Sequence, residues 1–108
     1  MILSELIKNI KPLNTVGDVG KDITGVEIDS RKIKAGNLFA AIKGTQADGH
    51  RFVPKAIEMG ATAILCEDMP ETKAEGVTYV QVASTESAVG PIATLFHGDP
   101  SRHLQLVG

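Results

Sequence analysis

The sequence predicts a single small α/β domain in which a parallel or mixed sheet is flanked by helices. Two observations predict this fold class. The chain has 108 residues, 43% of them hydrophobic and 22% charged, which is the size and composition of one globular domain. Short apolar runs typical of strands alternate along it with segments whose apolar residues recur at helical spacing.

The first expected elements are a helix and two strands. The helix ends at Pro12, and its apolar residues recur at helical spacing, namely Leu3, Leu6, Ile7 and Ile10. A turn-rich stretch over residues 14–22 follows, and residues 23–29 then form a strand whose side chains alternate between two faces. Residues 38–42 are a continuous apolar run, which is typical of a strand buried on both faces.

A helix and a further strand come next and complete a βαβ unit. Pro54 lies in the first turn of this helix, where its missing N–H costs little, and Gly60 ends the helix as a C′ glycine. Residues 61–66 form a second buried strand. Because strand, helix and strand follow in this order, the two strands are expected to be parallel and joined by a right-handed crossover.

The next part of the chain predicts one more strand and one more helix. Residues 67–76 are polar and indicate a surface connection, and residues 77–82 form the strand. Ser84 or Thr85 can cap the helix that follows. Pro91 falls inside this helix, which predicts a kink or a late start.

The final residues predict the beginning of another unit. Residues 103–107 read as a strand, and a strand followed by a glycine is how a phosphate-binding loop often begins. We therefore divide the chain into a domain over residues 1–102 and a strand over residues 103–108 that leads toward a further domain.

Charge and composition argue against several classes of function. The net charge of −2 gives no electrostatic case for nucleic acid or an anionic membrane. Cys66 is the only cysteine, so the chain cannot form an internal disulfide, which suits a reducing compartment. The N-terminus lacks the apolar region of a signal peptide, and no apolar stretch reaches the roughly 18–20 residues of a membrane span. We therefore expect a cytoplasmic protein.

No catalytic set and no metal site is predicted. The three histidines lack metal-ligand spacing with one another or with Cys66, so they are interpreted as surface or capping residues: His50, His97 and His103. Cys66 follows two apolar residues in a strand and is interpreted as a buried, inert thiol. The acidic residues after it are interpreted as a solvated connection: Glu67, Asp68, Glu71 and Glu75.

Polar residues gather at the ends of two predicted strands. Residues 29–31 end the first strand, and residues 44–50 follow the second. If the strands are neighbours, both groups meet at one edge, where glycines would let backbone groups approach a flat heterocycle. Arg31 or a hydroxyl could then meet a phosphate. Alternatively, Asp29, Arg31 and Asp48 only cap turns and pair with one another.

The same region carries a resemblance to a known family. The motifs are Asp29-Ser30-Arg31, residues 36–44, residues 48–52 and Gly60-Ala61. Together they resemble the N-terminal domain of Mur ligases, the ATP-dependent enzymes that add amino acids to the UDP-N-acetylmuramoyl precursor of bacterial peptidoglycan. Residues 44–50 and 96–108 resemble the MurE type in particular, which adds the third residue of the peptide.

The resemblance implies that this domain holds the UDP group of UDP-N-acetylmuramoyl-L-alanyl-D-glutamate. By position, the family's contacts fall on five residues: Ile28, Ser30, Thr45, Gln46 and Ala47. Backbone groups of Ile28, Thr45 and Ala47 would read the uracil edge. The side chains of Ser30 and Gln46 would hydrogen-bond the ribose-diphosphate portion.

The resemblance also implies where the chemistry lies. The parent protein would be an ATP-dependent, ADP-forming acid–amino-acid ligase of cell wall biogenesis, which forms an acyl phosphate and needs Mg²⁺. ATP and Mg²⁺ would be bound by the central and C-terminal domains of the same chain, because the glycine-rich loop ending in Lys-[Ser/Thr] does not occur in these residues. The 108 residues alone are therefore expected to hold no cofactor and to catalyse nothing.

Two alternatives stay open on the sequence. The domain could be the equivalent part of a MurF-type ligase. It could also be a free-standing module that uses the same loops to bind a protein. The sequence does not determine which amino acid the parent enzyme would add.

Overall fold

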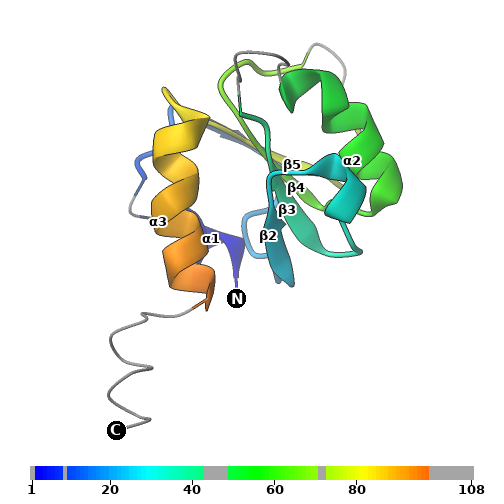
Figure 1. Ribbon diagram of the computed structural model, residues 1–108. Coiled ribbons are helices and arrows are strands. Elements are labelled where there is room, and N and C mark those ends of the chain that lie inside the picture. Colours follow the sequence, from blue (N-terminus) through cyan, green and yellow to red (C-terminus); the bar gives the residue numbers. More distant parts are fainter. Residues whose placement is uncertain (1, 9, 43–48, 71–72, 98–108) are drawn as a thin grey trace, which may run out of the picture.

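The computed structural model describes residues 2–8, 10–42, 49–70 and 73–97, and its centre is a five-stranded sheet with helices on both faces (Figure 1). The strand order is β1-β5-β4-β3-β2. The strands are β1 (Asn14–Val16), β2 (Gly25–Glu27), β3 (Asn37–Ala40), β4 (Ala63–Cys66) and β5 (Thr78–Gln81).

The sheet is mixed. The neighbouring pairs from β2 to β5 are all parallel, and β1 runs antiparallel to β5. The register places Phe39 beside Ile64 and Leu65 beside Val80, so fully buried side chains of adjacent strands lie next to one another. The predicted α/β class and the parallel β3–α2–β4 unit are confirmed.

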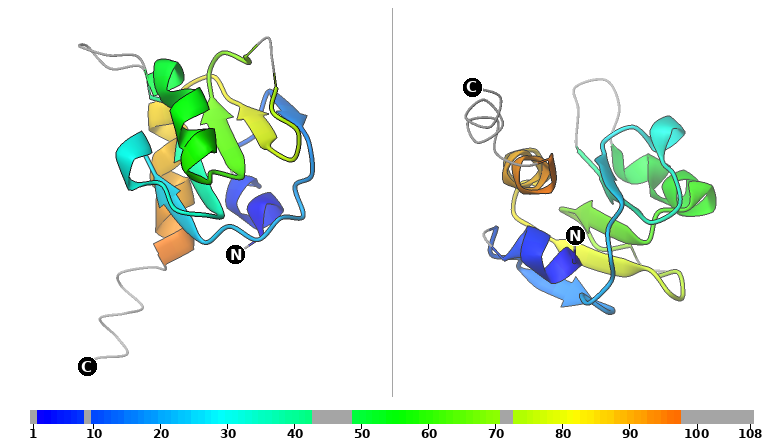
Figure 2. Two further views of the ribbon diagram at one scale, coloured as in Figure 1. Left: turned by 90° about the vertical axis from the view of Figure 1, so that its right-hand side faces the viewer. Right: turned by 90° about the horizontal axis from the view of Figure 1, so that it is seen from below.

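Two layers of helix cover the sheet (Figure 2). The helices α1 (Leu3–Ile7) and α3 (Thr85–His97) pack on one face, and α2 (Val53–Met59) packs on the other. The alternation of strand side chains produces a core on each face. Leu38 and Leu65 belong to the α1 and α3 side, whereas Phe39 and Tyr79 belong to the α2 side.

Two short 3₁₀ helices lie at the ends of strands and prove important for the site. They are η1 (Ser30–Lys32), after β2, and η2 (Gly49–Phe52), directly before α2. The strand predicted over residues 23–29 is therefore shorter, because β2 ends at Glu27 and Asp29 already caps η1.

The prediction of a turn-rich stretch over residues 14–22 is wrong at its beginning, where β1 forms. This strand has three residues and an alternating exposed pattern, without the apolar run that identifies a buried strand. Backbone pairing with β5 holds it, and the Leu13 N–H donates to the carbonyl of Gln81 at 2.7 Å just before it. Such a strand depends on a distant partner and leaves little signal in its own residues.

The ends of the helices follow the sequence closely. Gly60 ends α2 with a φ of 119°, as predicted for a C′ glycine. Ser84 caps α3, since its hydroxyl accepts the Ser87 N–H at 3.3 Å. The predicted late start of α3 is wrong, because the helix begins at Thr85 and continues through Pro91. Ser87 and Pro91 are both exposed, so water can reach the Ser87 carbonyl that Pro91 leaves without an N–H.

Candidate functional site

The two strands that precede the polar groups of the sequence are neighbours in the sheet. Because β2 and β3 are parallel neighbours, the segments that follow them leave the sheet at the same, carboxyl end. The condition for the two polar groups to meet, that their strands are neighbours, is therefore fulfilled. Three of the predicted site residues lie outside the described part of the chain: Thr45, Gln46 and Ala47.

The first group, residues 28–31, includes an exposed apolar residue and a buried serine. Ile28 follows β2 and is 59% exposed, although it is a large apolar side chain. Ser30 begins η1 and is only 6% exposed, and its carbonyl accepts the Ile33 N–H at 3.4 Å. The backbone at Ile28 is therefore presented near solvent, whereas the position of Ser30 is fixed by packing.

Asp29 and Arg31 form a two-pronged ion pair beside Ser30. Oδ1 of Asp29 accepts from the Arg31 backbone N–H at 2.9 Å and from Nε at 3.1 Å, and Oδ2 accepts from Nη2 at 2.9 Å. These hydrogen bonds from Arg31 lower the pKa of Asp29 to about 2, and the same carboxylate raises the pKa of Arg31. The alternative interpretation thus holds for this pair, which caps η1, while Asp48 lies outside the described residues.

The end of β4 contributes a polar network to the same edge. Nε2 of His50 accepts the backbone N–H groups of Glu67 at 3.0 Å and Asp68 at 3.2 Å. The Glu67 carbonyl accepts from Nε2 of Gln81 at 3.0 Å, and its carboxylate accepts the Thr85 N–H at 3.3 Å. Glu67 therefore connects η2, β5 and the first turn of α3.

This network corrects the interpretation of Glu67 as part of a solvated connection. Its carboxylate lies at the N-terminus of α3, where a negative charge is favoured by the helix dipole. Sequence reasoning missed it because the two residues are 18 positions apart and only the fold brings them together. His50 has the capping role that was expected for the histidines.

The interpretation of Cys66 as an inert thiol is supported by its surroundings. The residue is fully buried in β4, and its Sγ donates to the Val80 carbonyl at 3.7 Å. Burial raises the pKa of the thiol to about 11, with a smaller contribution from Asp68. Among the residues that the structure describes, no three His, Cys, Asp or Glu side chains are placed to hold a metal ion.

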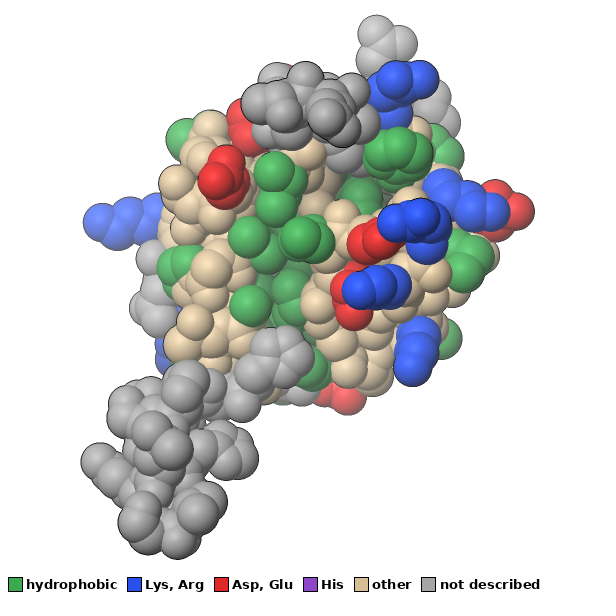
Figure 3. Space-filling view, viewed as in Figure 1, with side chains coloured by type: hydrophobic (Ala, Val, Ile, Leu, Met, Phe, Trp, Pro, Cys, Tyr) green, Lys and Arg blue, Asp and Glu red, His purple; other side chains and the backbone are tan. Residues whose placement is uncertain are grey.

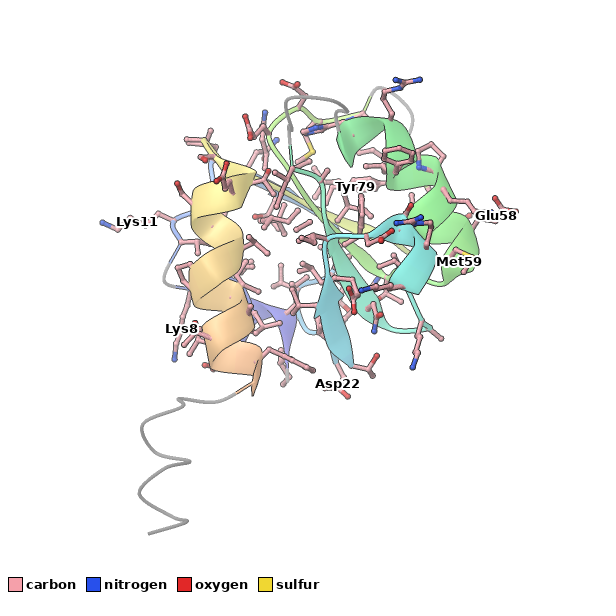
Figure 4. All side chains as sticks on the ribbon, in the orientation of Figure 1. Lys8, Lys11, Asp22, Glu58, Met59 and Tyr79 are labelled. Atoms are coloured by element: carbon pink, nitrogen blue, oxygen red, sulfur yellow. The ribbon has the colours of Figure 1, made fainter. Side chains whose placement is uncertain are left out.

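A shallow hollow lies beside the first turns of α3. It is an open groove of about 270 Å³ between the residues that follow α1 and the start of α3. Ser84, Ser87 and Pro91 line its α3 side, and Lys11 lies at its rim and extends into solvent (Figure 4). Hydrophobic side chains also gather between α3 and β2 (Figure 3). Within the described ranges, no helix has the length and apolar character needed to cross a membrane.

Comparison with known proteins gives consistent matches. Residues 22–97 match the family described as "Mur ligase family, catalytic domain". The chain is 56% identical to the UDP-N-acetylmuramoyl-L-alanyl-D-glutamate--2,6-diaminopimelate ligase of Bacteroides thetaiotaomicron and 55% identical to the ligase of that name from Bacteroides fragilis. Each match covers 100% of this chain and 22% of the relative, so the chain spans about a fifth of the length of these curated relatives.

Solved structures share the fold. MurF from Acinetobacter baumannii superposes with a TM-score of 0.73 at 22% identity, over 84% of this chain and 20% of that one. The MurF ligase from Thermotoga maritima, solved in complex with ADP, gives a TM-score of 0.55 at 27% identity, over 62% of this chain and 15% of that one.

Proposed function

The chain belongs to the Mur ligase family, and from this premise we propose that it binds the UDP group of UDP-N-acetylmuramoyl-L-alanyl-D-glutamate. The parent enzyme would be an ATP-dependent ligase that adds the third residue of the peptidoglycan peptide in the cytoplasm. The observation that carries the proposal is the 56% identity, over the whole chain, to a ligase named for that substrate. The structures of MurF ligases, at 22–27% identity, favour the MurF alternative less.

Residues that follow the carboxyl ends of β2 and β3 would contact different parts of the nucleotide. The backbone of Ile28, together with that of Thr45 and Ala47, would pair with the donors and acceptors of the uracil edge. The exposure of Ile28 supports this role. Ser30 and Gln46 would hydrogen-bond the ribose-diphosphate portion, and because Arg31 is engaged by Asp29, a hydroxyl is the better phosphate partner in this segment.

The chemical step would take place on other domains of the parent chain. There, a substrate carboxylate oxygen would attack the γ-phosphate of ATP, releasing ADP, and the incoming amine would then displace phosphate from the acyl phosphate. The residues described here do not fit a Mg²⁺ site, since no acidic cluster among them is placed for one. The domain's contribution to catalysis would be to anchor the far end of the substrate.

The role of Ser30 is tested by Ser30→Ala in the complete enzyme. Loss of one hydrogen bond to a charged or polar ligand group should weaken binding of the UDP substrate about tenfold, measured by calorimetry. Ser4→Ala is a matched control, because Ser4 is an exposed serine of α1 and should leave the affinity unchanged. Unchanged affinity in a correctly folded Ser30→Ala enzyme would contradict the role given to this hydroxyl.

The amino acid that is added is a separate prediction. Because the relatives at 55–56% identity are named for 2,6-diaminopimelate, we expect the complete enzyme to use that amine. Its kcat/KM for meso-diaminopimelate should exceed that for L-lysine by at least about a hundredfold, since a site that hydrogen-bonds an extra polar group rejects the analogue lacking it. Phosphate release measured with each amine tests this, and a preference for lysine would contradict it.

A further inference from the structure

Basic side chains gather on one side of the molecule, although the net charge of the chain is negative. Residues 27–35 and 49–60, which include η1, η2 and α2, carry five basic and three acidic residues, whereas the rest of the chain carries six basic and ten acidic residues. Lys and Arg side chains are accordingly seen on the side where η1 and α2 lie (Figure 3). The net charge of −2 therefore combines a positive surface with a more negative remainder.

The packing of two segments brings the positive charges together. Ile33, which follows η1, is 3% exposed and belongs to the same buried core as Val53 and Ala56 of α2. The Gly36 N–H donates to the Gly60 carbonyl at 3.0 Å, which joins the end of this segment to the end of α2. All five basic side chains of the two segments are exposed: Arg31, Lys32, Lys34, Arg51 and Lys55.

Four of these cations form what we call the basic surface: Lys32, Lys34, Arg51 and Lys55. Arg31 is left out because its guanidinium is paired with the carboxylate of Asp29 at 2.9 Å. The other acidic residues of the two segments are Glu27, which is half-buried, and Glu58, which is exposed. Four cations against two carboxylates leave an excess of positive charge on this surface.

The basic surface adjoins the described part of the proposed nucleotide site. Ser30 lies two residues before Lys32, a separation of at most about 7 Å along an extended chain. Electrostatic interactions in water extend over a Debye length, about 8 Å at physiological salt. An anion that approaches Ser30 therefore comes within the electrostatic field of this surface. The diphosphate and the terminal glutamate of the proposed substrate are both anionic.

We propose that the basic surface steers the anionic UDP substrate to the carboxyl ends of β2 and β3, an inference that rests on the proposed function. Exposed charges contribute little to a contact once it has formed, because water and salt screen them. They do act on a ligand while it approaches, and they raise its local concentration near the site. The basic surface would therefore raise the association rate constant and leave the dissociation rate constant almost unchanged.

Charge reversal at two positions of the basic surface tests the steering in the complete enzyme. Lys32→Glu/Lys55→Glu should lower the association rate constant at least about fivefold at about 0.1 M salt, while the dissociation rate constant stays within about twofold. Stopped-flow fluorescence with a fluorescently labelled UDP-N-acetylmuramoyl-L-alanyl-D-glutamate measures both constants. At about 1 M salt, where the Debye length is about 3 Å, the variant and the wild type should associate at rates within about twofold of each other.

Two matched variants separate charge at this surface from other effects. Lys32→Arg/Lys55→Arg retains both charges and should keep the wild-type association rate constant within about twofold. Lys8→Glu/Lys11→Glu makes the same change of charge at exposed residues beside α3, away from η1 and α2 (Figure 4). This variant should also stay within about twofold of the wild type at about 0.1 M salt, because salt screens charges that lie beyond a Debye length.

The outcomes distinguish the steering from the proposed function. An unchanged association rate constant in Lys32→Glu/Lys55→Glu, or an equal loss in both charge-reversed enzymes, would overturn steering by the basic surface. Failure of the wild-type enzyme to bind the UDP substrate would instead contradict the proposed function itself.

Discussion

At the scale of single residues, the candidate site is dominated by groups that satisfy one another. Asp29 and Arg31 share three hydrogen bonds, so neither charge is presented to a ligand without competition. The Asp29 side chain caps η1, the short helix that begins with Ser30. Under the proposed function, the pair would shape this segment, and the ligand contacts would fall to backbone groups and a hydroxyl.

The Asp29–Arg31 pair predicts a dependence of stability on pH. The pKa of Asp29 is lowered from 3.8 to about 2, so the pair stabilises the folded state fully above the unfolded value. The contribution is lost as the pH falls from about 4 through about 2. The advantage of the wild type over Asp29→Asn in free energy of unfolding should therefore be constant between pH 5 and 7 and shrink below pH 4.

Urea unfolding of both chains over this pH range measures the effect, and a carboxyl NMR titration checks its cause. In Arg31→Ala, the pKa of Asp29 should return toward 3.8, because the largest cause of the shift has been removed. An advantage over Asp29→Asn that persists unchanged at pH 2 would contradict the assignment.

At the scale of elements, the junction between α2 and β4 depends on one glycine. Gly60 has a φ of 119°, and an added Cβ would lie 2.8 Å from Cα of Ala35. Backbone strain from the positive φ and overlap of the new Cβ with Ala35 act together in this variant. Gly60→Ala should therefore lower the free energy of unfolding by about 2–4 kcal/mol. Urea denaturation of the variant measures this loss.

Substitutions at two other glycines distinguish the effect of backbone strain from the effect of steric overlap. At Gly76, φ is 81° but no atom lies within 4 Å of an added Cβ, so Gly76→Ala should show the backbone strain alone, about 1–2 kcal/mol. Gly90 lies inside α3 with open space around it, so Gly90→Ala should stabilise the protein by about 0.5–1 kcal/mol. Equal losses at Gly60 and Gly76 would show that contact with Ala35 contributes nothing.

At the scale of the whole molecule, the sequence alone predicted the elements and helix ends that depend on local residue patterns. The apolar runs that became β3 and β4 were identified because burial on both faces leaves an uninterrupted signal. Gly60 was identified because a left-handed helix end favours glycine. The adjacency of β2 and β3 was only a condition of the site hypothesis, and the sheet order meets that condition.

What could not be predicted depends on residues that meet only in the folded chain. The strand β1 forms by pairing with the edge of β5, and its own three residues lack the apolar run that identifies a buried strand. The contacts of Glu67 with His50 and Thr85 span 17 and 18 positions, and no local motif indicates them. The polar residues of the candidate site were proposed from the sequence, whereas the hydrogen-bond network around Glu67 was not.

The course of α3 has a consequence for how such a domain can serve a larger enzyme. The helix begins at Thr85, beside the carboxyl edge, and runs back past the sheet toward the side where α1 lies (Figure 1). Its 13 residues rise about 20 Å, at 1.5 Å per residue. The far end of the helix thus lies about 20 Å from its first residue beside the carboxyl ends of the strands, the edge at which the nucleotide would be held. Such a separation suits an elongated substrate held by a part that does not react. The affinity for the nucleotide part of the substrate could then change without moving the reacting atoms.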